Sequence, residues 1–340
     1  MSIDLLQVKG VKCSSIASGI KKNNILDLSL ISLSKGSSTA AVFTQNIFCA
    51  APVIVSKNHI NSNIEALLIN SGNANAGTGE RGLEDCYNTC VYLAEELEIK
   101  PEQVLPFSTG VIGEFLPLEA FKSNVNILVS SLSKNGMSKV ANGILTTDLV
   151  EKSYSTSINI GGKTVTLSGV AKGSGMIRPD MATMLSFIVS DISASKEELQ
   201  DCLTHAVNQS FNRITVDGDT STNDACSLSA TNQSGVQLSQ CKGEFQKALN
   251  LVSKELAQMI VKDGEGATKF VEIKIEGLES SEDCLEVAYT IAHSPLVKTA
   301  LFASDANWGR ILAAVGRAKV NGVSIENIDI YINGLQIIVS

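Results

Sequence analysis

Apolar residues recur at intervals of three and four along parts of this 340-residue chain, and they alternate or run together in others. The helical spacing predicts amphipathic helices over residues 80–98, 196–211 and 245–261. The alternating or continuous apolar runs predict strands, most clearly over residues 66–69, 163–170, 184–189, 270–275 and 285–291. This mixture favours an α/β (α+β) layered sandwich in which helices cover central sheets.

Two other segments carry local signals. Asn333 and Gly334 separate the apolar segments 329–332 and 335–339, which is typical of a hairpin turn. The second of these segments ends at once at Ser340, so we expect the chain to be truncated or to be a short form. Segment 159–179 is rich in Gly, Ser and Lys, and we expect it to approach residue 183 along the surface.

Composition and charge exclude several classes of protein. Hydrophobic residues make up 44% of the chain and charged residues 18%, which is ordinary for a well-folded enzyme and unlike a disordered protein. The net charge of −8 gives no basic footprint for nucleic acid. No apolar run approaches the roughly 20 residues of a membrane span. The N-terminus has no signal-peptide pattern, so we expect a cytoplasmic protein.

The eight cysteines and three histidines show no spacing typical of a zinc site. Cys86 and Cys90 lie one helical turn apart on the apolar face of the helix predicted over 80–98. Because cytosolic thiols remain reduced, we interpret the cysteines as reduced residues of the core.

Candidate chemistry is concentrated in segment 172–185, which reads KGSGMIRPDMATML. Thr183 follows a glycine-rich turn and precedes a predicted strand. A threonine hydroxyl is a weak nucleophile until a base activates it, and the threonine's own α-amine is such a base once the peptide bond before it is cut. The alternative is that this segment is a turn followed by a buried strand, in which Thr183 is present only because threonine favours strands.

Segment 172–185 resembles the cleavage segment of the ornithine acetyltransferase (glutamate N-acetyltransferase) family, which cuts itself between Ala and Thr. Other segments resemble the family in the same order along residues 8–340. They are FTQN at 43–46, NSGNANA at 70–76, STGVIG at 108–113, TTD at 146–148, NRITVDGDTSTND at 212–224, DGEGATK at 263–269, SPLVKTA at 294–300 and NWGRI at 307–311. The family's C-terminal segment has no counterpart. The resemblance implies a fold like that of ornithine acetyltransferase and the DmpA aminopeptidase.

The resemblance also implies an activity. The enzyme would move an acetyl group from N²-acetyl-L-ornithine to L-glutamate in arginine biosynthesis, by a ping-pong reaction through an acetyl-Thr183 intermediate. Self-cleavage between Ala182 and Thr183 would first give an α chain of residues 1–182 and a β chain of residues 183–340, with two of each in a heterotetramer. Acetyl-CoA would be a second donor in a bifunctional form, and no other cofactor is implied. The alternatives are an N-terminal-nucleophile amidase or aminopeptidase, and an inactive truncated form.

Site roles follow from the same resemblance. Thr109 and Gly110 match an oxyanion-hole pair, a hydroxyl and a backbone N–H that stabilise a tetrahedral oxyanion. The matched substrate-binding residues are Thr146, Lys172, Thr183 and Glu265. Without the resemblance, each has an ordinary structural explanation: a Ser-Thr-Gly turn at 108–110, a helix cap at Thr146, and solvated charges at Lys172 and Glu265.

Two patterns near these residues suggest ligands only superficially. Asp217, Asp219 and Asp224 lack the glycine and terminal glutamate of an EF-hand loop, so helix capping and structural hydrogen bonds are the preferred interpretation, and no metal is expected. Segment 172–175 leads to a strand and lacks the order of a phosphate-binding loop, so a phosphate cradle is rejected.

Overall fold

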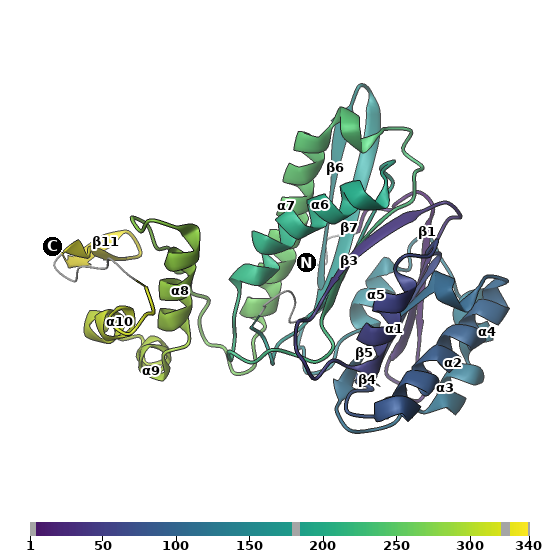
Figure 1. The fold of residues 1–340 in the computed structure, drawn as a ribbon, viewed down its shortest axis with the longest axis horizontal. Helices are drawn as coiled ribbons and strands as arrows, with labels where there is room; N and C mark the ends of the chain where they lie inside the picture. The colour runs from purple at the N-terminus through teal and green to yellow at the C-terminus, as the bar shows by residue number, and fades with distance from the viewer. Residues whose placement is uncertain (1–4, 179–183, 321–326, 339–340) are drawn as a thin grey trace. The chain divides into compact units, whose positions relative to one another are not determined.

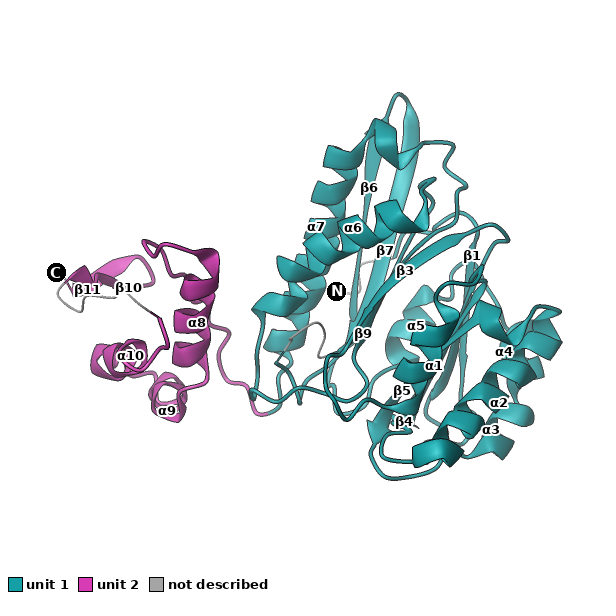
Figure 2. Ribbon diagram, in the orientation of Figure 1, with its two compact units in different colours: residues 1–265 teal, residues 266–340 magenta. Residues whose placement is uncertain are grey.

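The computed structural model describes residues 5–178, 184–320 and 327–338. The chain divides into two compact units, residues 1–265 and 266–340 (Figure 2). In the described parts of both units, no helix is both long and apolar enough to cross a membrane.

The first sheet of unit 1 has four strands in the order β1 (Val11–Ile16), β2 (Leu28–Leu33), β4 (Ala66–Asn73) and β5 (Val104–Val111). β1, β2 and β4 are antiparallel neighbours, whereas β4 and β5 are parallel and joined through a helix. One face is covered by α1 (Ala51–His59), α2 (Gly79–Leu97), α3 (Leu118–Lys122) and α4 (Val125–Ser130) (Figure 1). Short 3-10 helices lie at Pro101–Gln103, Phe211–Arg213 and Leu238–Gln240.

The second sheet has five strands in the order β3 (Ser38–Phe43), β9 (Ala225–Ala230), β8 (Leu185–Ser190), β7 (Lys163–Lys172) and β6 (Lys152–Ile160). β8 and β9 are parallel and the other pairs are antiparallel. Its outer face packs against α6 (Lys196–Asn208) and α7 (Lys242–Lys262). Ser195 caps α6 by accepting a hydrogen bond from the N–H of Glu198, whose carboxylate accepts from the N–H of Ser195.

The two sheets face each other across a shared apolar layer. Phe107 of β5 and Phe187 of β8 meet edge to face with ring centroids 4.9 Å apart. The helix α5 (Met137–Gly143) contributes Met137, Val140 and Ala141 to the same layer. Unit 1 is therefore built as helices, sheet, sheet and helices, and the predicted α/β layered sandwich is confirmed.

Strand register brings several ends together. Leu185, at the start of β8, pairs with Lys172 at the end of β7 and with Ala225 at the start of β9. In the first sheet the ends of β4 and β5 are paired, with Gly72 opposite Gly110. These pairings bring residues that are distant in sequence to neighbouring strand ends, where loop residues can form a site.

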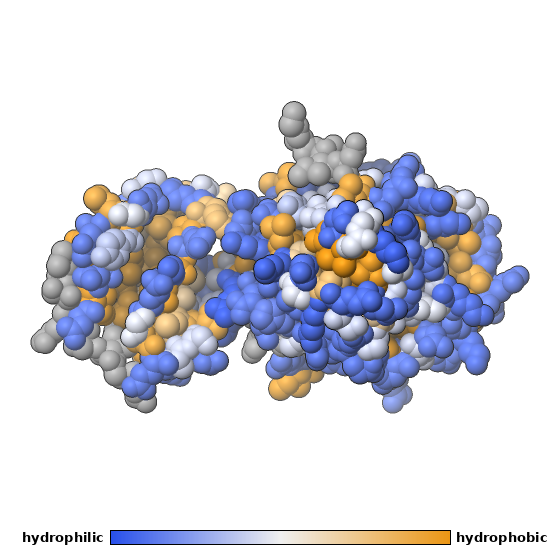
Figure 3. All heavy atoms as spheres, turned by 90° about the horizontal axis from the view of Figure 1, so that it is seen from above, coloured by the Kyte–Doolittle hydropathy of each residue, from blue (hydrophilic) through white to orange (hydrophobic). Residues whose placement is uncertain are grey.

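Unit 2 contains α8 (Ser281–Ala292), α9 (Pro295–Phe302), α10 (Trp308–Val315) and a hairpin of β10 (Ile330–Ile332) and β11 (Leu335–Ile338). Its described core is small, with Val287, Ile291 and Val297 among the few fully buried side chains. Figure 3 shows apolar residues on the face of this unit, between polar ones. Phe302 and Trp308 are among the exposed apolar side chains of this unit. The described elements of the unit therefore leave part of its apolar surface exposed.

Most of the predicted elements are confirmed. The helices α2, α6 and α7, the strands β4, β7 and β8, and the hairpin at Asn333 and Gly334 lie at the predicted places. Six of the eight cysteines are buried, and all eight are free of disulfides. Burial raises the pKa of Cys13, Cys90 and Cys226 to about 12, so these thiols stay protonated.

Three predictions are wrong. Segment 270–275 forms no strand, and segment 285–291 is helical within α8. The apolar residues there alternate, but Ser280 caps the helix and Glu282 and Asp283 occupy its first turn, which favours a helix. The described part of segment 159–179 does not run along the surface throughout, because residues 165–171 are buried in β7.

Candidate active site

Lys172 is the centre of the described site, and its ammonium joins two other predicted residues. Its Nζ donates to Oγ1 of Thr146 at 2.8 Å and to Oγ1 of Thr109 at 3.2 Å. Only 12% of the lysine side chain is exposed. Burial lowers the pKa of Lys172, while the negative charges of Asp148, Asp224 and Glu265 act to raise it. Thr109 and Thr146, which are distant in sequence, therefore meet at one cation.

Gly110 lies near the end of β5, opposite Gly72 of β4. Its φ is +136°, and a Cβ built on it would lie 2.3 Å from the carbonyl carbon of Gly72 and 2.5 Å from the N of Asn73. Because both neighbours are backbone atoms, no side chain fits without moving the strand end. Gly110 is required by the local backbone, whatever its N–H does in a reaction.

Glu265 lies beside the turn that follows Lys172. Its N–H donates to the carbonyl of Ser174 at 2.8 Å, and a Cβ on Gly175 would come within 2.9 Å of either carboxylate oxygen. The side chain is exposed. A glycine at 175 therefore lets the glutamate carboxylate lie against the turn, and the described residues place Glu265 near Lys172.

A small pocket adjoins these groups. Its lining comprises Thr109, Lys172, Gly173, Gly175, Met176, Ile177, Met184, Leu185, Ser221, Asn223 and Asp224. Asn223 is fixed in the wall, since its Nδ2 donates to the carbonyls of Ala74 (2.6 Å) and Ser108 (2.9 Å). Asp224 is 4% exposed, and its Oδ2 has no hydrogen-bond partner among the described residues. Burial raises the pKa of Asp224 well above its usual range.

Asp217 supports the turn from another side. Its carboxylate accepts from the N–H of Met176 at 2.5 Å and from the N–H of Ile177 at 2.9 Å. The interpretation of this aspartate as a structural hydrogen-bonding residue is confirmed. In the described part of the chain, no group of three His, Cys, Asp or Glu residues is arranged to hold a metal ion.

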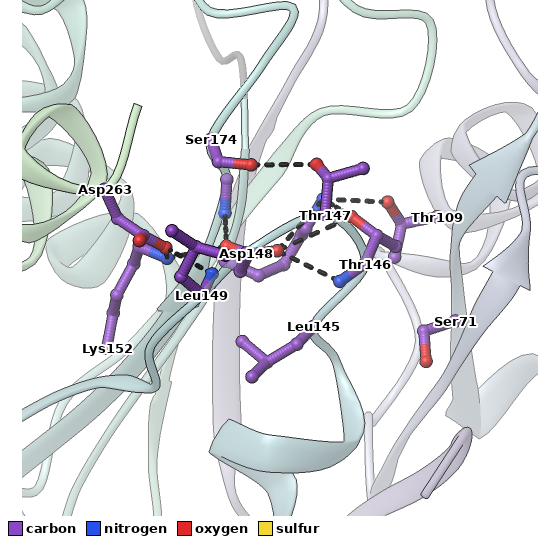
Figure 4. Close-up of polar contacts among 12 residues, drawn as sticks. Ser71, Thr109, Leu145, Thr146, Thr147, Asp148, Leu149, Lys152, Ser174 and Asp263 are labelled. Atoms are coloured by element: carbon purple, nitrogen blue, oxygen red, sulfur yellow. Dashed lines mark hydrogen bonds and ion pairs between the residues drawn. The ribbon is translucent and has the colours of Figure 1, made fainter. Parts of the chain in front are cut away.

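Sequence reasoning missed Asp148, whose carboxylate accepts hydrogen bonds from Thr146, Lys152 and Gly173 (Figure 4). Its Oδ1 accepts from the N–H of Gly173 at 2.6 Å, and its Oδ2 accepts from the N–H of Thr146 at 3.0 Å. Burial alone would raise the pKa of Asp148, but the charges of Lys172 and Lys152 and the hydrogen bonds from Lys152 and the Thr146 N–H outweigh it and lower the pKa to about 2. Asp148 is therefore a carboxylate at neutral pH. The only sequence signal was its place in the segment 146–148.

The proposed nucleophile and cleavage site, Thr183 and Ala182, lie outside the described residues. What the structure does describe is the next two positions, because Met184 and Leu185 line the pocket. The described residues thus bring together Thr109, Gly110, Thr146, Lys172 and Glu265.

Comparison with known proteins gives matches along nearly the whole chain. A model of the ArgJ family matches residues 12–340. The chain is 47% identical to the arginine biosynthesis bifunctional protein ArgJ of Pseudomonas syringae pv. tomato, over 97% of this chain and 83% of that protein. It is 48% identical to the protein of the same name from Methylococcus capsulatus, over 99% of this chain and 83% of that protein.

Solved structures give weaker spatial matches. The crystal structure of the ArgJ bifunctional protein of Bacillus halodurans is 39% identical, with a TM-score of 0.49, and the match covers 54% of this chain and 100% of that chain. Ornithine acetyltransferase of Mycobacterium tuberculosis, solved with ornithine, is 30% identical, with a TM-score of 0.45, and the match covers 53% of this chain and 98% of that chain.

Proposed function

The chain belongs to the ArgJ family, and from this premise we propose that it transfers an acetyl group from N²-acetyl-L-ornithine to L-glutamate in arginine biosynthesis. The observation that carries the proposal is the meeting of Thr109 and Thr146 at the ammonium of Lys172, beside a pocket. An ammonium with two hydroxyl partners suits a small substrate with a carboxylate. The matched relatives are named bifunctional, so acetyl-CoA is included as a second donor.

In the proposed reaction Thr183 is the nucleophile. Its hydroxyl oxygen attacks the acetyl carbonyl carbon of the donor, and its proton passes to the free α-amine of the same residue. The tetrahedral intermediate collapses to acetyl-Thr183, and the donor's amine leaves with the proton. The amine of glutamate then attacks the ester, which returns the hydroxyl to Thr183.

Thr109 is suited to stabilise the oxyanion in both steps. Its Oγ1 accepts a hydrogen bond from Lys172, so its own O–H proton is directed elsewhere, and no described acceptor takes it. With the N–H of Gly110, it would give two donors at the end of β5. Lys172 thus has two proposed tasks, because it orients the Thr109 hydroxyl and offers charge to the substrate carboxylate.

The proposal includes an assembly and a location. Cleavage between Ala182 and Thr183 would give α and β chains, two of each in the enzyme, and the reaction would take place in the cytoplasm. No metal ion takes part in the proposed reaction. Light scattering beside a denaturing gel would measure the mass and the number of chains.

Thr183→Ala tests the function directly. It should remove both self-cleavage and acetyl transfer, because one hydroxyl performs both, whereas Thr183→Ser should keep part of each. Thr164→Ala, at an exposed position of β7, is the matched control and should behave as wild type. Denaturing gels and assays with acetylornithine, with and without glutamate, separate transfer from hydrolysis. Transfer by the alanine variant would show that another nucleophile acts.

A further inference from the structure

Lys152 is a fully buried cation outside the residues assigned to the reaction. Its side chain has 0% exposure at the start of β6. Its Nζ donates to Oδ1 of Asp148 at 2.7 Å, to Oδ2 of Asp263 at 2.6 Å and to the carbonyl of Val150 at 3.1 Å. A buried ammonium is costly unless it is paired and hydrogen-bonded, and Lys152 has both kinds of contact.

Asp148 connects this cation to two residues proposed to bind substrate. Its Oδ1, shared with Lys152, also accepts from the N–H of Gly173, the residue directly after Lys172. Its Oδ2 accepts from the N–H of Thr146 and lies 4.0 Å from Nζ of Lys172. Lys172 and Thr146 are hydrogen-bonded to each other, and Asp148 contacts both segments. A displacement of Asp148 would therefore displace both residues.

Asp263 makes the third connection, at the end of α7. Its Oδ2 accepts from the N–H of Leu149 at 3.0 Å as well as from Lys152. Two residues further along, Glu265 donates its N–H to Ser174 in the turn after Lys172. In the same turn, the Oγ of Ser174 and the Oγ1 of Thr147 are 2.8 Å apart. The three segments are thus joined to one another and to Lys152 (Figure 4).

We propose that Asp148, Lys152 and Asp263, together called the buried ion triad, are positioning residues that hold Thr146, Lys172 and Glu265 in the arrangement that binds substrate. Asp148 has the further task of keeping Lys172 charged. The inference rests on the proposed function for the identity of the substrate, acetylornithine.

The charges of the buried ion triad allow the positioning role to be tested. Asp148 and Asp263 both pair with Lys152, and Asp148 also lies near Lys172, so loss of the Asp148 charge removes one negative partner from each ammonium group. Lys172 is also faced by Asp224 before β9, Glu265 after α7 and Lys21 after β1. Among the charges that raise the pKa of Lys172, that of Asp148 is the largest, whereas Asp263 is not among its principal causes.

The experiment compares Asp148→Asn with Asp263→Asn. Both variants loosen the triad, and kcat/KM for acetylornithine should fall toward the roughly 10²-fold loss that a 1 Å misplacement causes, mostly through KM. In Asp148→Asn alone, the alkaline limb of the pH profile should also move to lower pH, because Lys172 loses its proton more readily. Asp201→Asn, which removes an exposed partner of Lys242, is the control and should change neither.

Four outcomes would contradict the inference or the proposed function. An unshifted alkaline limb in Asp148→Asn, or an equal shift in Asp263→Asn, would overturn the inference. If Asp148→Asn does not fold, Asp148→Glu keeps the charge and should raise KM without moving the limb; a moved limb would contradict the charge assignment. Wild type is assayed first: no transfer by wild type contradicts the proposed function itself, whereas transfer with an unshifted limb contradicts only the triad.

Discussion

Asp148 and Asp224 are both buried aspartates whose charges act on Lys172, yet their pKa values move in opposite directions. For both carboxyl groups burial is the largest single cause, and it raises the pKa. At Asp148, the charges of Lys172 and Lys152, together with hydrogen bonds from Lys152 and the N–H of Thr146, reverse that effect. At Asp224, the hydrogen bonds from Ser221 and the charge of Lys172 also act to lower the pKa, but they do not outweigh burial. The difference shows that the number of fixed partners, and not depth alone, decides the charge of a buried carboxyl group.

The two carboxyl groups also differ in what they leave open. Both oxygens of Asp148 accept hydrogen bonds from described donors, so neither is left open toward the pocket. Asp224 lines the pocket with one oxygen that has no described partner. Unsatisfied polar groups of this kind reduce stability and are found where proteins bind ligands.

The largest effect is expected from Asp148→Asn. Breaking one partner of a buried ion pair costs about 3–5 kcal/mol. The folded pKa of about 2 lies below the unfolded value of about 3.9, so the carboxylate stabilises the fold above pH 4, and this contribution is lost as the pH falls through 2. Urea unfolding of wild type and variant between pH 3 and 8 should show a difference that shrinks toward acid. A constant difference would mean that charge is not the cause.

Asp224→Asn should have a smaller effect of opposite sign. Its folded pKa is raised, so the folded protein holds this proton more tightly, and the resulting penalty is absent at acid pH and grows as the pH rises above about 3.9. The amide cannot ionise, so the variant should be more stable by about 1 kcal/mol at pH 8, with a smaller gain at pH 5. Thermal unfolding at both pH values measures this. A loss of stability at pH 8 would show that the carboxylate has a partner in solution.

The smallest effect is expected at an exposed pair. Asp201 and Lys242 are 4.0 Å apart, with side chains 75% and 60% exposed. Asp201→Asn should change the free energy of unfolding by less than about 0.5 kcal/mol, because water and salt screen such pairs. Unfolding in low and high salt would check this. A change as large as that of Asp148→Asn would remove the contrast between buried and exposed carboxylates.

The helices α2, α6 and α7 could be predicted because each buries one face, which leaves a period of 3.6 in the sequence. The helix α8 could not, since alternation at Leu285, Val287 and Tyr289 imitates a strand. Its caps were the better signal, as Ser280 and the acids after it show.

The site was predicted unevenly for a similar reason. Thr109, Thr146 and Lys172 came from resemblance, not from spacing, and the structure brings them together. Lys152 and Asp263 are 111 positions apart, so no local pattern joins them. Both would ordinarily be read as solvated charges. Only the fold, which places the start of β6 against the end of α7, shows that the two are a pair.

The strand order of the five-stranded sheet has a consequence for the proposed cut. Residues 1–182 would supply β3, β7 and β6, and residues 183–340 would supply β9 and β8 between them. The order β3-β9-β8-β7-β6 therefore interleaves the two products, and each would lose interior hydrogen bonds if it departed. The cleaved molecule should migrate as one species in native size-exclusion chromatography, and its fragments should separate only on denaturation. Two polypeptides would then share one cooperative unfolding transition.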